Sequence, residues 1–122
     1  MDKLLEIVSL LDCYGELLTE KQRNVMELYY SEDLSLSEIA EHEKITRQGV
    51  HDSIKRSEQY LFEMEQKLGF VARNEKLTRK LGRIGELAAA ASAENAKYSY
   101  SRNIDEYMHE LIGCIEELDE II

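Results

Sequence analysis

One short stretch of the chain carries side chains that suit hydrogen bonding to the edges of DNA bases. Arg47, Gln48 and His51 follow one another closely there. Arginine pairs well with guanine and glutamine with adenine, so these types at the start of a helix are typical of sequence recognition in the major groove. Basic side chains that would meet phosphate oxygens stand around them: Lys44, Lys55 and Arg56.

Two predicted helices position these side chains. Ser35, with Glu38 three residues later, forms a capping-box pattern and predicts the start of a short helix. A turn is expected at residues 43–45, and Thr46 predicts the cap of a second helix. The pattern is typical of a helix-turn-helix, whose second helix lies in the major groove, although a helical hairpin of another function would share it. The predicted DNA-binding residues are Lys44, Thr46, Arg47, Gln48, His51, Lys55 and Arg56.

Two residues of this stretch depart from the usual motif, and a third is unexpected in a basic surface. Glu43 and Lys44 stand at the turn, where many such motifs have an apolar residue followed by glycine. A left-handed conformation at Lys44 would cost about 1 kcal/mol relative to glycine, and a charged Glu43 resists burial, so we expect a more open turn. Asp52 is an acid within a basic surface. We expect it to pair with Arg56 one turn later, the alternative being a hydrogen bond to a cytosine amine.

The charge of the chain is unevenly distributed. Its net charge is −10 over 122 residues, which argues against nucleic-acid binding. However, residues 44–83 carry ten Lys and Arg against five Asp and Glu, whereas residues 1–43 and 84–122 are strongly acidic. A basic stretch of this kind favours contact with phosphate, the alternative being a solvated helix surface with internal ion pairs.

The remaining periodicity predicts an all-α protein. A first helix is expected over residues 2–14, with Leu4, Leu5, Val8 and Leu11 on its inner face. Thr19 and Gln22 form a second capping box that opens a helix ending near Tyr30. The second helix of the motif is expected to run for about 22 residues, to Gly69. We therefore expect a helix-turn-helix domain of three or four helices at residues 1–70 and a helical extension at 71–122.

The extension is expected to contain a loop and a last amphipathic helix. Residues 92–103 resemble a loop, and a helix is predicted from residue 103 or 104 to 122. Apolar residues recur seven apart in it, which favours either a homodimer seam or packing on the same chain. The predicted dimerisation residues are Ile104, Met108, Leu111, Ile115, Leu118 and Ile122.

No constellation of residues indicates catalysis, a cofactor or a metal. His42, His51 and His109 fall on separate predicted helices, and Cys13 and Cys114 match no metal-ligand spacing. Glu106 and His109 form only half of a di-iron motif. The chain has no apolar run long enough for membrane insertion and no signal peptide, so a non-catalytic cytoplasmic protein is expected.

Several of these stretches closely resemble the YlxM family of small bacterial proteins. The resemblance covers residues 1 to about 70 and is carried by LLTEKQ at 17–22, YY at 29–30, DLSLSEIAE at 33–41 and RQGVHDSIKR at 47–56. It implies an all-helical, cytoplasmic, DNA-binding protein similar to the sigma-factor region that reads the promoter −35 element. It also implies a link to the signal recognition particle pathway, with that particle's components as further partners.

Two other classes of function compete with a dimeric regulator that binds double-stranded DNA. A protein-interaction module that has lost DNA binding would account for the net charge of −10 and the altered turn. A protein that binds structured RNA, such as signal recognition particle RNA, could use the same basic stretch on phosphates. The basic stretch and the Thr46-Arg47-Gln48 start favour DNA.

Overall fold

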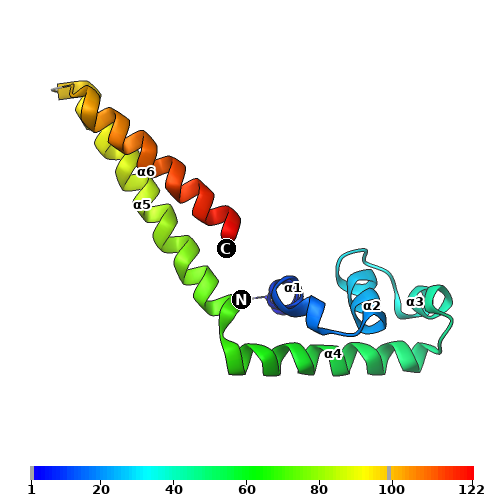
Figure 1. Ribbon diagram of the computed structural model, residues 1–122. Helices are drawn as coiled ribbons and strands as arrows, with labels where there is room; N and C mark the ends of the chain where they lie inside the picture. Colours follow the sequence, from blue (N-terminus) through cyan, green and yellow to red (C-terminus); the bar gives the residue numbers. More distant parts are fainter. Residues whose placement is uncertain (1, 99) are drawn as a thin grey trace. The chain divides into compact units, whose positions relative to one another are not determined.

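Helices account for all of the regular secondary structure in residues 2–98 and 100–122, the part of the chain that the computed structural model describes (Figure 1). The prediction of an all-α fold is therefore confirmed. The chain divides into two compact units, Met1–Val71 and Ala72–Ile122.

The first unit is organised around one long helix. Its elements are α1 (Lys3–Tyr14), the 3-10 turn η1 (Gly15–Leu17), α2 (Glu20–Tyr30), α3 (Leu36–Glu43) and α4 (Arg47–Leu68). Helices α1, α2 and α3 each pack on α4, and Figure 1 shows them along one side of it. The predicted length of α4, about 22 residues, is confirmed.

A single apolar core joins these four helices. Burying each of its larger side chains contributes about 1.5–3 kcal/mol. The core consists of Ile7, Leu10, Leu11, Tyr14, Leu18, Val25, Met26, Ile39, Val50, Ile54 and Leu61. The predicted inner face of α1 was wrong in part, because Leu4 and Leu5 are 49% and 59% exposed while Ile7 is 0% exposed. An error of one residue in helical phase rotates the face by about 100°.

The helix ends follow the predicted caps. Thr19 with Gln22, and Ser35 with Glu38, both form complete capping boxes. Gly69 ends α4 at φ +66°, a left-handed conformation that favours glycine. These local interactions delimit the helices before any tertiary contact is considered.

Two tyrosines anchor carboxylates of α4 to other parts of the first unit. Tyr14 donates a 2.5 Å hydrogen bond to Glu65 Oε1 and accepts one of 3.1 Å from the Phe70 amide. Tyr30 donates to Glu58, whose side chain is buried. Burial, followed by the hydrogen bond to the carboxylate, raises the pKa of each phenol above its usual value.

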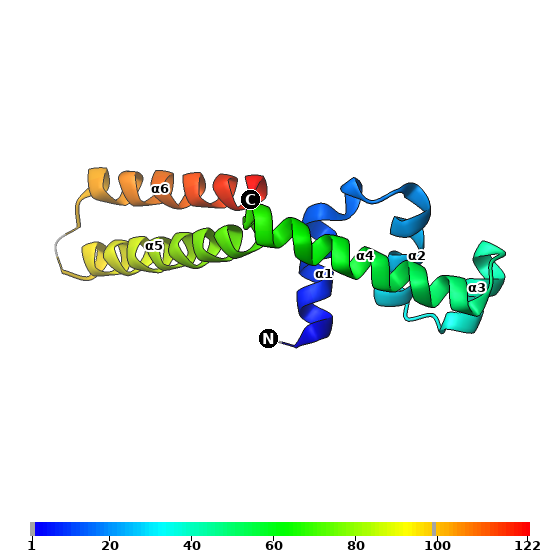
Figure 2. The ribbon, with the colours of Figure 1, turned by 90° about the horizontal axis from the view of Figure 1, so that it is seen from below.

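The second unit is an antiparallel hairpin of α5 (Phe70–Tyr98) and α6 (Arg102–Ile121), side by side in both ribbon views (Figures 1 and 2). The loop predicted at 92–103 was wrong for residues 92–98, which continue α5; residue 99 lies outside the described residues. The alanines among residues 88–96 explain the continuation, since alanine has the highest helix propensity. The predicted last helix is confirmed as α6, with Ser101 as its cap.

The hairpin uses part of the proposed dimerisation seam for itself. Ile115 is buried and Met108 half-buried, whereas Ile104, Leu111, Leu118 and Ile122 stay exposed. Packing on the same chain, one of the two alternatives, therefore occupies some of these residues.

Candidate nucleic-acid interface

The turn between α3 and α4 is closed by a left-handed residue. Lys44 has φ +57° and ψ +43°, and its amide donates to the Ala40 carbonyl. The Ile45 amide donates to the same oxygen at 3.1 Å. The expected opening of the turn was therefore wrong, because these two hydrogen bonds satisfy the end of α3 despite the strain at Lys44. Glu43 stays only partly buried, with its carboxylate 3.5 Å from His42 Nδ1.

The first two turns of α4 separate an apolar side from a polar side. Val50 and Ile54, which lie four positions apart on one face of the helix, are buried in the core. All of the residues predicted to contact DNA are exposed: Lys44, Thr46, Arg47, Gln48, His51, Lys55 and Arg56. The structure thus brings them together on the accessible part of the turn and the amino-terminal half of α4.

The start of α4 is held by a side-chain cap. Thr46 Oγ1 accepts a 2.9 Å hydrogen bond from the Gly49 amide. A Cβ atom at position 49 would lie 3.1 Å from that oxygen, so glycine leaves room for the cap. The first amides of a helix have no partner within the helix, and together with the helix dipole they favour a nearby phosphate.

Asp52 organises the polar side chains next to it. Gln48 Nε2 donates a 3.0 Å hydrogen bond to Asp52 Oδ1, and His51 Nδ1 lies 3.7 Å from the same oxygen. The expected pairing of Asp52 with Arg56 was wrong, since the carboxylate contacts Gln48, one turn earlier, instead. In this arrangement Asp52 holds a side chain that was predicted to read a base.

A shallow pocket on this surface adds an apolar contact. It is lined by Leu36, Arg47, Gln48 and His51. Leu36 was not among the predicted interface residues, because its position after the Ser35 cap does not show that its side chain reaches α4. An apolar side chain beside base-reading groups suits the methyl group of thymine.

The candidate interface is basic, and its Lys and Arg side chains are not engaged in ion pairs within the described residues. Within residues 2–98 and 100–122, no ion pair joins Lys44, Arg47, Lys55 or Arg56 to an acid.

No group of three or more His, Cys, Asp or Glu within residues 2–98 and 100–122 is placed to hold a metal ion. None of the helices there is both long and apolar enough to cross a membrane.

Over most of its length the chain is similar to a family of helix-turn-helix proteins. The model of the UPF0122 family, "Putative helix-turn-helix protein, YlxM / p13 like", matches residues 1–100. A UPF0122 protein of Clostridium perfringens is 44% identical over 122 residues, which cover 100% of this chain and 98% of that protein. One from Shouchella clausii is 42% identical over 119 residues, covering 98% and 99%. One from Desulforamulus reducens is 61% identical over 62 residues, covering 51% and 53%.

Proposed function

The chain belongs to the UPF0122 family of YlxM/p13-like helix-turn-helix proteins, and we propose that it binds double-stranded DNA in a sequence-dependent way through the start of α4. One observation carries the proposal. The turn and the first half of α4 present four cations that have no acidic partner among the described residues, alongside Gln48 and His51, on an exposed surface backed by the core.

The side chains divide into two roles. Arg47, Gln48 and His51 lie at the helix start, where a recognition helix reaches base edges. Lys44, Lys55 and Arg56 flank them as phosphate contacts, which supply a large share of the affinity and make it depend on salt concentration. Thr46 caps the helix and so orients its first amides toward a phosphate.

The proposed biological role follows the family resemblance. A likeness to the sigma-factor region that reads the −35 element supports a regulatory, non-catalytic protein of the cytoplasm. A homodimer would present two recognition helices to two half-sites of one operator. A contribution to the signal recognition particle pathway, through its protein or RNA components, is the second part of the role that the resemblance implies.

A protein-interaction module is the competing function. The net charge of −10 weakens association with DNA at long range, and Gln48 is held by Asp52 rather than free to reach a base. In this case the helix-turn-helix is a retained scaffold, and the acidic segments engage a protein. The two functions predict opposite results in a direct binding experiment.

The experiment is selection of duplexes from a random-sequence library, followed by fluorescence anisotropy with the selected duplex, a scrambled duplex and signal recognition particle RNA. Each titration is repeated at several salt concentrations. We expect the selected duplex to bind more tightly than the scrambled one, with a steep salt dependence.

Matched variants connect binding to α4. Arg47→Ala/Gln48→Ala should remove the preference for the selected duplex. Gln66→Ala/Lys67→Ala removes one amide and one cation from exposed positions at the far end of the same helix and should leave the preference intact. Absence of duplex binding at low salt would refute the proposal and favour the protein-interaction module.

A further inference from the structure

The hairpin of α5 and α6 leaves most of its apolar side chains in contact with solvent. Within residues 72–98 and 100–122, only Ala88 and Ile115 are buried. Larger apolar side chains that are 41–51% exposed are Leu77, Ile84, Leu87, Ile104, Leu111 and Leu118. Two helices that bury so little lack the core that stabilises helical bundles, and further packing against their exposed side would supply it.

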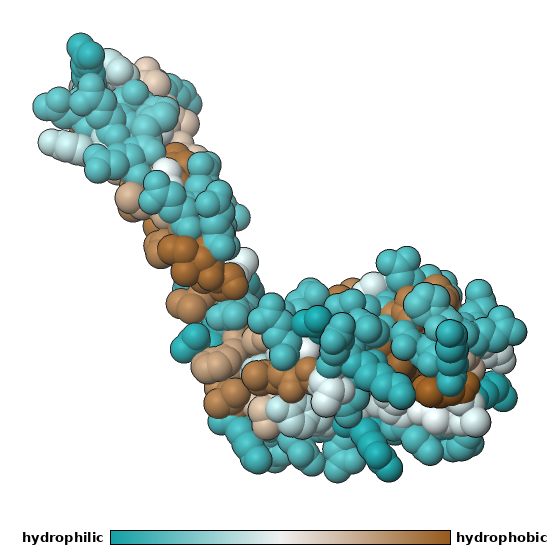
Figure 3. Space-filling view, turned by 45° about the vertical axis from the view of Figure 1, so that its right-hand side comes forward, coloured by the Kyte–Doolittle hydropathy of each residue, from teal (hydrophilic) through white to brown (hydrophobic). Residues whose placement is uncertain are grey.

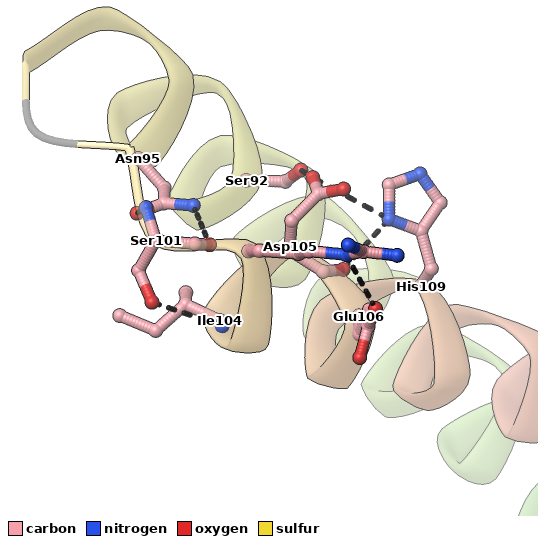
Figure 4. A network of polar contacts seen from close by, with 8 residues as sticks. Ser92, Asn95, Ser101, Ile104, Asp105, Glu106 and His109 are labelled. Atoms are coloured by element: carbon pink, nitrogen blue, oxygen red, sulfur yellow. Dashed lines mark hydrogen bonds and ion pairs between the residues drawn. The ribbon is translucent and has the colours of Figure 1, made fainter.

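Polar contacts near the turn determine how the two helices are aligned (Figure 4). Asn95 Nδ2 donates to the Ser101 carbonyl at 2.8 Å, and the Ser101 amide donates to Asn95 Oδ1 at 3.0 Å. Ser92 Oγ donates to Asp105 Oδ1 at 3.2 Å. Residue 92 therefore faces residue 105, and positions earlier in α5 face positions later in α6.

The exposed apolar residues of the two helices lie on the same side of the hairpin. Leu87 and Leu111 are exposed, and each stands one position before a less exposed residue, Ala88 and Ile112 respectively. One position back is a rotation of about 100° around the helix axis. Because the helices are antiparallel and their inner faces oppose each other, this step turns Leu87 and Leu111 toward the same side of the hairpin. Ile104 and Leu118, eight positions before and six after Ile112, point within about 20° of Leu111. Figure 3 shows hydrophobic residues gathered on the hairpin, away from the α5–α6 turn.

The exposed charges of α5 and α6 indicate which partner packs on the apolar side of the hairpin. Exposed basic residues occupy the first part of α5: Arg73, Lys76, Arg79, Lys80 and Arg83. Exposed acids occupy the last part of α6: Glu116, Glu117, Asp119 and Glu120. In the antiparallel hairpin these two segments lie at the same end. A surface that is apolar along its length, with opposite charges on its two helices, is complementary to a copy of itself.

We propose that a second copy of this chain docks on the exposed apolar side, forming a four-helix bundle in which α5 of each copy lies beside α6 of the other. A two-fold axis parallel to the helices produces this pairing and brings each basic segment against the other copy's acidic segment. The alternative, with α6 beside α6, would pack together two helices that each carry seven Asp and Glu against one Arg over residues 102–121. This inference gives a structure to the dimer proposed above, and oligomeric state is measured without DNA, so the two proposals fail separately.

Light scattering on the full chain, over a range of concentrations, tests the surface. The unchanged protein should have twice the chain mass of 14.2 kDa at high micromolar concentration. Ile84→Lys/Leu111→Lys should give the monomer mass with helical circular dichroism retained. Ala89→Lys/Ala93→Lys adds the same two charges at exposed positions of α5 that point away from the apolar side, and should remain dimeric.

Charge reversal tests the pairing of α5 with α6. Lys76→Glu/Lys80→Glu and Glu117→Lys/Glu120→Lys should each lower dimer affinity about tenfold or more. Mixing the two variants should restore a dimer, because each altered segment then meets its complement on the other copy. Repulsion within one chain cannot be relieved by mixing. A monomeric unchanged protein, a dimer insensitive to the Ile84/Leu111 change, or no recovery on mixing would overturn the proposal.

Discussion

Gln48 Nε2 donates a 3.0 Å hydrogen bond to Asp52 Oδ1, one turn later on the exposed side of α4. The contact joins a proposed base-reading amide to an acid that repels phosphate. Asp52→Ala should release Gln48 and remove the repulsion, and so raise affinity for any duplex about three- to tenfold at low salt. Anisotropy with the selected and scrambled duplexes measures this. If affinity falls for the selected duplex alone, Asp52 itself contacts a base, as a cytosine amine would require.

Lys44 allows stability and DNA binding to be separated. Its left-handed backbone is strained, so Lys44→Gly should raise the free energy of unfolding by about 1 kcal/mol in urea titrations. The same change removes a proposed phosphate contact, which should reduce the slope of log affinity against log salt by about 0.9. Asp33 has the same φ of +57° and lies outside the proposed interface. Asp33→Gly should give the stability gain without loss of binding.

The hydrogen bond from Tyr30 to Glu58 should stabilise the first unit. Tyr30→Phe leaves the buried carboxylate of Glu58 without its phenolic donor and should lower the free energy of unfolding by about 1–3 kcal/mol. Tyr98→Phe, at a phenol that is 72% exposed, should change it by less than about 0.5 kcal/mol. Equal effects in the two variants would show that the buried contact contributes nothing specific.

The raised pKa values of Tyr14 and Tyr30 predict a loss of stability at alkaline pH. In the unfolded chain a phenol ionises near pH 10, whereas in the folded protein these two keep their protons to higher pH. The unfolded state thus binds fewer protons above about pH 10, and stability falls as pH rises, by at most about 1.4 kcal/mol per phenol per pH unit. Urea titrations of the unchanged protein from about pH 8 to about pH 11 measure this decline.

Tyr30→Phe tests whether Tyr30 contributes to the loss of stability at alkaline pH. It should be less stable than the unchanged protein near neutral pH and approach it above about pH 10, because it has one fewer raised pKa to lose. A difference in the free energy of unfolding that stays constant from about pH 8 to about pH 11 would show that ionisation of Tyr30 is not coupled to unfolding.

Features set by neighbouring residues could be predicted from the chain alone. The capping boxes at Thr19 and Ser35, the Thr46 cap and the stop at Gly69 depend on side chains within three or four positions. For this reason the bounds of α2 and α4 and the helix-turn-helix itself were predicted correctly. The clustering of basic residues in 44–83 likewise required only counting.

Other features required knowledge of which surfaces meet. The partner of Asp52 depended on side-chain placement, since Gln48 and Arg56 are equally distant along the chain and only Gln48 contacts it. Leu36 joined the candidate interface because α3 packs against α4.

The chain alone predicted the helices of the first unit with most of their ends, the family and the composition of the candidate interface. Tertiary structure decided which side of each helix is buried, as Ile7 in place of Leu4 and Leu5 shows. It also decided that Ile115 turns into the hairpin while Leu111 stays exposed. The continuation of α5 through residues 92–98, by contrast, is a local effect of its alanines that the predicted loop missed. The difference comes from the distance along the chain over which each kind of interaction acts. Caps and propensities act over one helical turn, whereas burial depends on contacts between residues far apart in the chain.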